Sequence, residues 1–202
     1  MTAAQQPARV VSPPRERPVR RLARAERREQ ILDAATRAFA RTGFTATGLD
    51  DVAAEAGVTH VILYRHFASK TDLYRAVLDR ARARLADTVG ADHYDEETIP
   101  GLLSAAAADP DGFRLLFRHA AREPDFRDVV DSIRSTSIEV AHHHLTERIP
   151  AGPWRDWAAR LVPTITLEAV IAWLDIGQPE PDRAAEHIWR AIESVIDAAH
   201  PD

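Results

Sequence analysis

Residues 49–67 read LDDVAAEAGVTHVILYRHF, two short helical patterns separated by a single glycine. The first pattern predicts a helix over 48–56, with Thr47 as its N-cap and its apolar side chains turned inward. Gly57 breaks that helix, and Thr59 is placed to cap a second short helix that runs to about His66. Two helices that cross steeply through such a tight turn are typical of a helix-turn-helix. An ordinary helical hairpin is the alternative.

The sequence on either side of this unit predicts one further helix each way. From residue 25, apolar side chains recur at spacings of three and four as far as Phe39, and Gly43 is placed to end that helix. After the unit, Ser69 and Asp72 match a capping box that starts a long helix. We therefore expect a three-helix DNA-binding domain over 25–72, followed by a long connecting helix.

Charge is divided sharply along the chain at Gly90. The net charge of −5 argues mildly against nucleic acid as a partner. Residues 1–90, however, hold 16 basic and 10 acidic side chains, a net of +6, whereas 91–202 hold 10 and 21, a net of −11. This asymmetry indicates a basic module joined to a different, acidic one.

Residues 1–24 are rich in proline and arginine and carry almost nothing apolar, so we expect a disordered basic arm. Such an arm could reach into an adjacent minor groove, or it could add only nonspecific attraction to DNA. We favour nonspecific attraction, because no arginine in the arm is fixed by spacing.

The remainder of the chain predicts only helices, so the expected fold class is all-α. The expected helices lie at about 96–108, 111–121, 125–148, 153–175 and 182–199, with Pro163 kinking the fourth. The chain has no cysteine, which excludes disulfides, thiolate metal sites and cysteine nucleophiles. No apolar run approaches the roughly 20 residues that span a bilayer, and the N-terminus lacks a secretory signal. We therefore expect a cytoplasmic protein without a membrane partner.

Three ordered motifs lie within residues 27–78: ILDAATRAFARTGF at 31–44, VAAEAGV at 52–58 and LYRHFASK at 63–70. They resemble the first helix, the helix-turn and the recognition helix of the tetracycline-repressor (TetR) family. The resemblance implies an N-terminal helix-turn-helix domain joined by a long helix to an all-helical ligand-binding and dimerisation domain, here 73–202. Two positions depart from the family's habit. Gly48 lacks the hydroxyl that members often carry there, and Val61 puts a branched side chain near the groove, so the operator sequence cannot be predicted.

Polar and aromatic side chains point outward from the second short helix. A DNA major groove about 12 Å wide would accommodate this helix, so that its side chains could reach the bases and phosphates. The resemblance implies that Thr47, Tyr64, His66 and Lys70 touch phosphates. It also implies that the bases are read by Thr59, His60, Val61 and Arg65. Lys70 is the only lysine and lies in the first turn of a helix, where a cation opposes the helix dipole, so a phosphate partner explains its position. A solvated charge is the alternative for Lys70, and core packing is the alternative for Tyr64 and His66. The predicted DNA-binding residues are Thr47, Gly48, Thr59, His60, Val61, Tyr64, Arg65, His66 and Lys70.

The last two expected helices carry two wide apolar stripes, more than one small domain has to cover. We therefore expect a homodimer that reads a pseudo-palindromic operator in double-stranded DNA, with recognition helices about 34–36 Å apart. The alternative is that both stripes pack within one subunit. The predicted interface residues are Leu161, Ile165, Ile188, Trp189, Ile192, Val195 and Ile196.

The resemblance also implies an effector pocket in the C-terminal region, and an apolar lining would suit a hydrophobic or aromatic small molecule. Most of the candidate residues would serve equally well as ordinary core. The candidates are Phe113, Leu116, Phe117, Phe126, Ile133, Trp154, Trp157 and Trp173.

One helix face carries Glu139, His143 and Glu147, on which a divalent metal or an enzyme could be built. We favour a solvated helix face, and we expect no metal, no cofactor and no catalytic residue. The sequence therefore predicts a TetR-like transcriptional regulator, a repressor that a small molecule releases from DNA. The alternatives are a DNA-binding regulator without ligand control and a metal-dependent helical enzyme.

Overall fold

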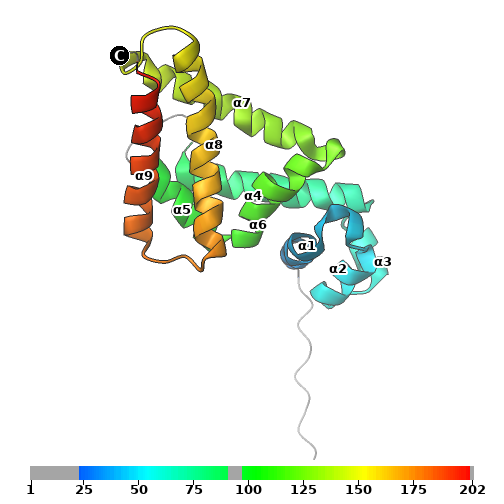
Figure 1. Cartoon of the computed structure of the whole chain (residues 1–202). Coiled ribbons are helices and arrows are strands. Elements are labelled where there is room, and N and C mark those ends of the chain that lie inside the picture. The colour runs from blue at the N-terminus through cyan, green and yellow to red at the C-terminus, as the bar shows by residue number, and fades with distance from the viewer. Residues whose placement is uncertain (1–22, 91–96, 201–202) are drawn as a thin grey trace, which may run out of the picture.

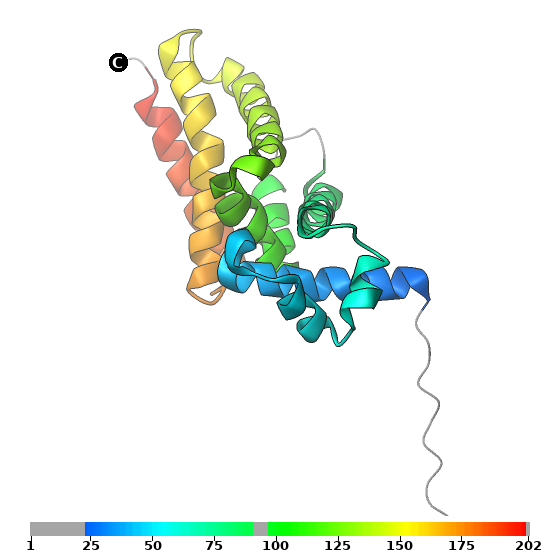
Figure 2. The same ribbon diagram turned by 90° about the vertical axis from the view of Figure 1, so that its right-hand side faces the viewer.

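The computed structural model describes residues 23–90 and 97–200, and every regular element in these ranges is a helix. Three helices at one end lead through the long α4 into a bundle of the remaining helices (Figures 1 and 2). The elements are α1 (Arg24–Ala46), α2 (Leu49–Ala56), α3 (His60–Tyr64), α4 (Lys70–Val89), α5 (Thr98–Ala108), α6 (Pro110–Arg114), η1 (Leu115–His119), η2 (Ala120–Arg122), η3 (Pro124–Phe126), α7 (Arg127–His144), η4 (Leu145–Glu147), α8 (Pro153–Asp175) and α9 (Pro181–Ala198). The all-α prediction is confirmed, and the predicted arm falls almost wholly outside the described residues.

Two glycines set the course of the chain around the helix-turn-helix. Gly43 has a φ of 79° and interrupts the helical backbone of α1, which confirms the predicted break, although one more turn follows to Ala46. Gly57 ends α2 in the left-handed conformation, with a φ of 62°. The backbone N–H of Gly57 donates to Ala54 and that of Val58 to Ala53, which is the Schellman pattern. This C-cap turns the chain into α3.

The predicted N-cap of α2 is wrong by one residue. Gly48 occupies the cap position, and its backbone N–H donates to the carboxylate of Asp51 at 2.7 Å. The Thr47 side chain is buried instead, and its hydroxyl donates to the Gly43 carbonyl at 2.6 Å. Because the Thr47 hydroxyl bonds to the end of α1, Thr47 does not serve as the N-cap of α2. The departure at Gly48 leaves this helix with no side-chain cap.

The predicted caps of α3 and α4 are confirmed, with one change in partner. The Thr59 side chain accepts from the Ile62 N–H, and α3 ends at Tyr64, two residues earlier than predicted. Ser69 accepts from the Asp72 N–H at 3.0 Å. The reciprocal bond of the capping box runs from the Ala68 N–H to the Asp72 carboxylate, one residue before the N-cap.

The C-terminal helices are predicted closely except where they bend. The single helix predicted at 111–121 is wrong, because the chain passes from α6 into a π-helical turn, η1, and then a 3₁₀ turn, η2. The helix predicted at 125–148 has 3₁₀ turns at both ends, η3 and η4, so its α-helical part is shorter. The bounds of α8 match the prediction, and Pro163 lies inside a helix that continues through it.

Two apolar cores divide the molecule, and α4 contributes to both. The first joins α1–α3 and the beginning of α4 to η1, η3 and the first turn of α7. Its centre is the fully buried ring of Tyr74, which lies 4.9 Å from that of Phe39, 5.0 Å from Phe44 and 4.6 Å from Phe126 between centroids. The second core joins α5 to α8 and α9. Phe117, in η1, packs against both cores.

Four residues of the predicted dimer interface are buried inside a single subunit. Each of them is less than a tenth exposed, because α9 packs against α5 as well as α8. The prediction took both stripes as uncovered, and α5 supplies the missing partner. These buried residues are Ile188, Ile192, Val195 and Ile196. Leu161, Ile165 and Trp189 are only partly buried at the edge of this core.

Helix α8 is the one described helix long and apolar enough to cross a membrane, with a mean hydropathy of 1.3 over its best window. This departs from the expectation that no such segment exists. Half of that window is buried inside the protein, where α8 packs against α5, α7 and α9. Burial of this kind is typical of the central helix of a bundle, which is apolar on most sides.

The half-buried His119 in the π-turn predicts a pH dependence of stability. Burial, with Arg122 and Arg118 nearby, lowers the pKa of His119 from its ordinary value near 6.5. The unfolded chain therefore binds more protons, so the unfolding free energy falls as pH drops below about 6.5. We expect His119→Asn to flatten this part of a urea-unfolding pH profile. The exposed His143→Asn is the control, and an unchanged slope in His119→Asn would contradict the assignment.

Candidate nucleic-acid interface

Helix α3 presents its outward side chains to solvent with no other element covering them. Val61 is 62% exposed and Tyr64 is 52% exposed, large values for apolar and aromatic residues. Thr59 and Arg65 are exposed beside them. The ring of His60 meets that of Tyr64 edge to face, and its Nε2 lies 3.0 Å from Asp50 Oδ1 on α2. The predicted base-reading residues therefore lie together on one exposed surface.

Four arginines around this surface make no ion pair with any described residue. Further along α1, by contrast, Arg37 and Arg41 both pair with Glu55, at 2.8 and 2.7 Å. The four without an acidic partner are Arg24, Arg27, Arg28 and Arg65. We call this set the arginine cluster. Uncompensated guanidinium groups beside a protruding helix make a surface suited to phosphates.

The field of the arginine cluster is visible at His66, just after α3. Burial lowers the pKa of His66 below its ordinary value of 6.5, and Arg24, Arg28 and Arg27 lower it further. His66 and Arg65 line a shallow depression with Arg24 and Arg27. The neutral imidazole is therefore favoured at this edge, where it can donate or accept one hydrogen bond.

Two residues with an implied phosphate role are engaged within the protein. The ammonium group of Lys70 donates to the carbonyls of Thr45 and Thr47, at 3.3 and 3.0 Å, and lies 4.5 Å from the ring centre of Phe44. The position of Lys70 therefore has an internal explanation, which the sequence argument did not consider. Thr47 is buried, and its hydroxyl is taken up by Gly43 and Thr42.

Three members of the arginine cluster were not among the residues predicted from the sequence. Arg24 was assigned to the disordered arm, but it is the first residue of α1. Arg27 and Arg28 follow at helical spacings of three and four, which put them on the same side of α1. That spacing was the available signal, and it would have extended the predicted surface beyond α3.

A partly open cavity of about 320 Å³ lies between α4, α5, α7 and α8, and we call it the inner cavity. Among the predicted ligand residues, Phe117 and Ile133 line it. Its other residues were not predicted, although they recur at helical spacing on α4 and α7. These are Arg82, Leu85, Ala86, Val89, Gly90, Thr98, Leu102, Ser132, Thr136, Ser137, Val140, Pro163, Thr166 and Leu167.

The remaining ligand candidates lie elsewhere. Phe126 is in the aromatic cluster around Tyr74, and Phe113 and Leu116 are buried beside a cavity of only about 20 Å³. Trp154 and Trp157 pack against each other on the surface at the start of α8, and Trp154 is 58% exposed. None of these five residues is among those that line the inner cavity.

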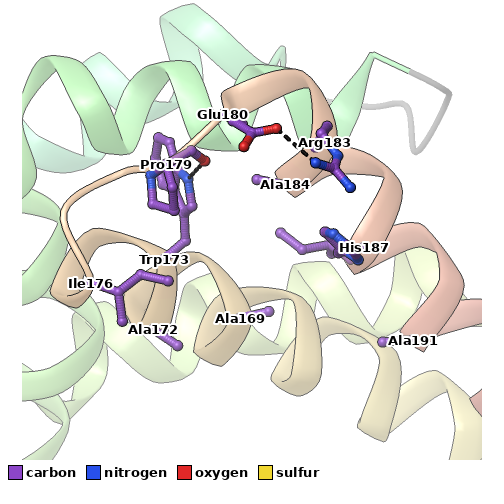
Figure 3. Close-up of a pocket in the computed structure, with 11 residues that line it drawn as sticks. Ala169, Ala172, Trp173, Ile176, Pro179, Glu180, Arg183, Ala184, His187 and Ala191 are labelled. Atoms are coloured by element: carbon purple, nitrogen blue, oxygen red, sulfur yellow. Dashed lines mark hydrogen bonds and ion pairs between the residues drawn. The ribbon is translucent and has the colours of Figure 1, made fainter.

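Trp173 lines a shallow apolar groove between α8 and α9, which we call the outer groove (Figure 3). The indole N–H of Trp173 donates to the Pro179 carbonyl at 2.8 Å, and this hydrogen bond closes one end of the groove. Ala169 and Ala172 form the α8 wall, and Ile176 at its end is 72% exposed. The groove therefore offers an uncovered apolar strip on the outer side of the bundle.

The described residues contain no group of three or more histidines and carboxylates arranged to hold a metal ion. Glu139, His143 and Glu147, which the sequence places on one face, form no such group. His142 lies 3.1 Å from Asp156 instead. Nothing in this part of the chain supports the metal-dependent alternative.

An exposed recognition helix, a glycine turn and a helical C-terminal bundle define the class: a helix-turn-helix protein with an added all-helical domain. A family model described as bacterial regulatory proteins, tetR family, matches residues 31–77. A TetR-like transcriptional regulator from Rhodococcus has the same fold, with a TM-score of 0.74, 26% identity, and coverage of 87% of this chain and 96% of that one. Residues 31–77 therefore match the tetR family of bacterial regulatory proteins, and the described chain has the fold of a TetR-like regulator.

Curated relatives are similar mainly in their N-terminal parts. The HTH-type transcriptional activator FasR of Mycolicibacterium smegmatis is 36% identical over 107 residues, 49% of this chain and 49% of FasR. An HTH-type transcriptional repressor of Streptomyces coelicolor is 37% identical over 89 residues, 44% of this chain and 46% of the repressor. Each match spans about half of the relative's length. These relatives are named as transcriptional regulators and not as enzymes.

The arginine cluster predicts a change in the salt dependence of DNA binding. We expect Arg27→Ala and Arg65→Ala each to weaken binding to all DNA sequences and to reduce the slope of log K against log salt by about one. Arg41→Ala, which removes an arginine already paired with Glu55, is the matched control. Fluorescence anisotropy at several salt concentrations measures both quantities. Equal slopes for Arg27→Ala and the wild type would contradict a phosphate contact.

Proposed function

We propose that this protein is a DNA-binding transcriptional regulator that acts as a homodimer on a pseudo-palindromic operator. The observation that carries the proposal is the exposed face of α3 beside four arginines without acidic partners. On this proposal Thr59, His60, Val61 and Arg65 face base edges, and the arginine cluster with Tyr64 and His66 faces the backbone. Lys70 supports the surface indirectly by tying the end of α1 to α4.

The outer groove is the surface we propose for the second subunit. Its walls carry alanines, which let a partner helix approach closely, and its apolar strip continues to the partly exposed Leu161 and Ile165 of α8. The buried residues of α9 take no direct part in this interface. The proposed interface therefore keeps Leu161, Ile165 and Trp189 from the predicted set and adds Ala169, Ala172 and Ile176.

The inner cavity is the proposed effector site, because it lies against the helix that also carries the DNA-binding domain. Leu85 and Val89 of α4 line the cavity, whereas Leu73 and Val77 of the same helix belong to the first core. Phe117 gives a second connection, since it lines the cavity and packs against both cores. A molecule that favours a different setting of α4 would lower operator affinity by its differential binding to the two states.

We propose that the protein is a repressor released by its ligand and that it acts in the cytoplasm. The alternative is a regulator without ligand control. The inner cavity favours ligand control, because about 320 Å³ falls within the range of small-molecule sites.

Tyr64→Ala tests DNA recognition. We expect the substitution to weaken binding to a DNA fragment from the protein's own gene neighbourhood by about ten-fold or more, because an exposed aromatic contact is lost. Stability should not change, since the Tyr64 side chain packs mainly against His60. Trp154→Ala is the control, because Trp154 is also an exposed aromatic residue but lies in α8, far from the DNA-binding domain. Wild-type affinity in Tyr64→Ala at moderate salt would count against the proposal.

Ala172→Arg tests the proposed dimer surface. A charged side chain in the outer groove should prevent close helix packing, convert the dimer to a monomer and reduce operator affinity by at least about ten-fold. Sedimentation velocity measures the oligomeric state. Ala107→Arg, at an exposed position on α5 away from the groove, is the control. A stable dimer in Ala172→Arg would place the interface elsewhere.

A further inference from the structure

Among the described residues, Arg82 is the only charged one that lines the inner cavity, and the others are apolar or hydroxyl-bearing. No carboxylate of the described residues is among them. Three other arginines of α4 have acidic partners: Arg75 pairs with Asp128, Arg80 with Glu29 and Asp33, and Arg84 with Asp109. Arg82 has no ion pair or hydrogen bond with any described residue. The cavity is therefore lined by one positive charge that no carboxylate of the described residues compensates.

Three hydroxyls on α7 line the same cavity without hydrogen bonds to described residues: those of Ser132, Thr136 and Ser137. Hydroxyls on other helices bond their own backbone; those of Thr88, Thr164 and Ser194 donate to the carbonyl four residues earlier. The α7 hydroxyls are thus available as donors to a ligand. Serine and threonine are neutral, so they add hydrogen bonds to the site without adding charge.

The polar groups gather at one end of the cavity, because α4 and α7 run in the same general direction (Figure 1). The Arg75 guanidinium fixes their N-terminal ends together, donating to Asp128 at 3.2 Å and to the Asp125 carbonyl at 2.8 Å. Arg82 lies about 10 Å further along α4, which brings it level with the hydroxyls of Ser132 and Thr136. Beyond this level Val89 on α4 and Val140 on α7 line the cavity, together with Thr98 at the start of α5.

We propose that the inner cavity binds an amphiphilic monocarboxylate with an aliphatic chain. The carboxylate lies at Arg82 and accepts hydrogen bonds from the α7 hydroxyls. The chain runs along Leu85, Val89 and Val140 towards Leu102. A guanidinium matches a carboxylate in charge and in the geometry of its paired N–H groups, which an alcohol or a cation cannot equal. This inference rests on the proposal that the cavity is the effector site.

The test compares three probes of equal chain length: decanoate, 1-decanol and decyltrimethylammonium. Isothermal titration calorimetry with the full chain should give about ten-fold tighter binding for decanoate than for 1-decanol, and weaker binding still for the cation. Arg82→Gln should reduce the affinity for decanoate to that for 1-decanol while leaving 1-decanol unchanged. Arg127→Gln, which changes an exposed arginine of α7 outside the cavity, should bind all three probes like the wild type.

A second variant tests where the aliphatic chain of the ligand lies. Val140→Phe should fill the far end of the cavity. It should therefore weaken the binding of decanoate several-fold and leave the binding of the shorter hexanoate unchanged. Equal affinities for decanoate and 1-decanol, or an unchanged decanoate affinity in Arg82→Gln, would overturn the inference. The absence of binding by any of the three probes would overturn it as well.

DNA binding separates this inference from the proposed function. If decanoate binds through Arg82 but does not change the affinity for operator DNA, the ligand class stands and effector control fails. If 1-decanol releases DNA as well as decanoate does, and Arg82→Gln behaves like the wild type, effector control stands and the carboxylate assignment is overturned. If decanoate releases DNA from the wild type but not from Arg82→Gln, both stand.

Discussion

The packing of Tyr74 against three phenylalanine rings is the interaction on which the arrangement of the protein depends. Phe39 and Phe44 come from α1, and Phe126 comes from η3, beyond the end of the DNA-binding domain. The ring of Tyr74 is wholly buried among them, and burial raises the pKa of its hydroxyl. Since aromatic pairs have preferred geometries as well as large buried areas, this cluster fixes how the helix-turn-helix is set on the bundle. The Arg75 contacts with η3 and α7 lie one residue further on and reinforce the same junction.

The arginines that have no carboxylate partner indicate where this protein can bind anions. Nine of the twenty arginines in the described residues pair with a nearby carboxylate, including those that hold α4 to α1 and to Asp109 just before α6. The exceptions in the DNA-binding domain gather beside α3, and Arg82 is the exception among the arginines of α4. Exposed ion pairs add little stability, so an arginine without one costs the fold little and remains free to bind an anion. The net charges of the two halves pointed to this division, but only the pairing pattern locates it.

Local chemistry explains which features the sequence could predict. Gly57, Thr59 and Ser69 act within a few residues of their own position, so the helix-turn-helix and its caps could be read directly. The N-cap role of Thr47 was predicted wrongly and the internal contacts of Lys70 were not foreseen, because the partners of both residues depend on how α1, α2 and α4 meet in space. The stripe of α9 was assigned to a dimer because the covering helix, α5, is far away in sequence. The inner cavity was missed for a related reason: each helix shows only its own lining residues, and no single helix reveals the space between them.

The π-turn at Leu115–His119 has a consequence for how neighbouring residues are aimed. A π-helical turn contains an additional residue, so side chains after it are rotated in phase relative to those before it. Leu116 can therefore enter the first core while the next residue, Phe117, reaches the cavity and the second core. In an uninterrupted α-helix a residue inserted or deleted here would turn everything downstream by about 100°. The π-turn thus shifts the helical phase, so that consecutive side chains can pack into two cores that one regular α-helix could not serve.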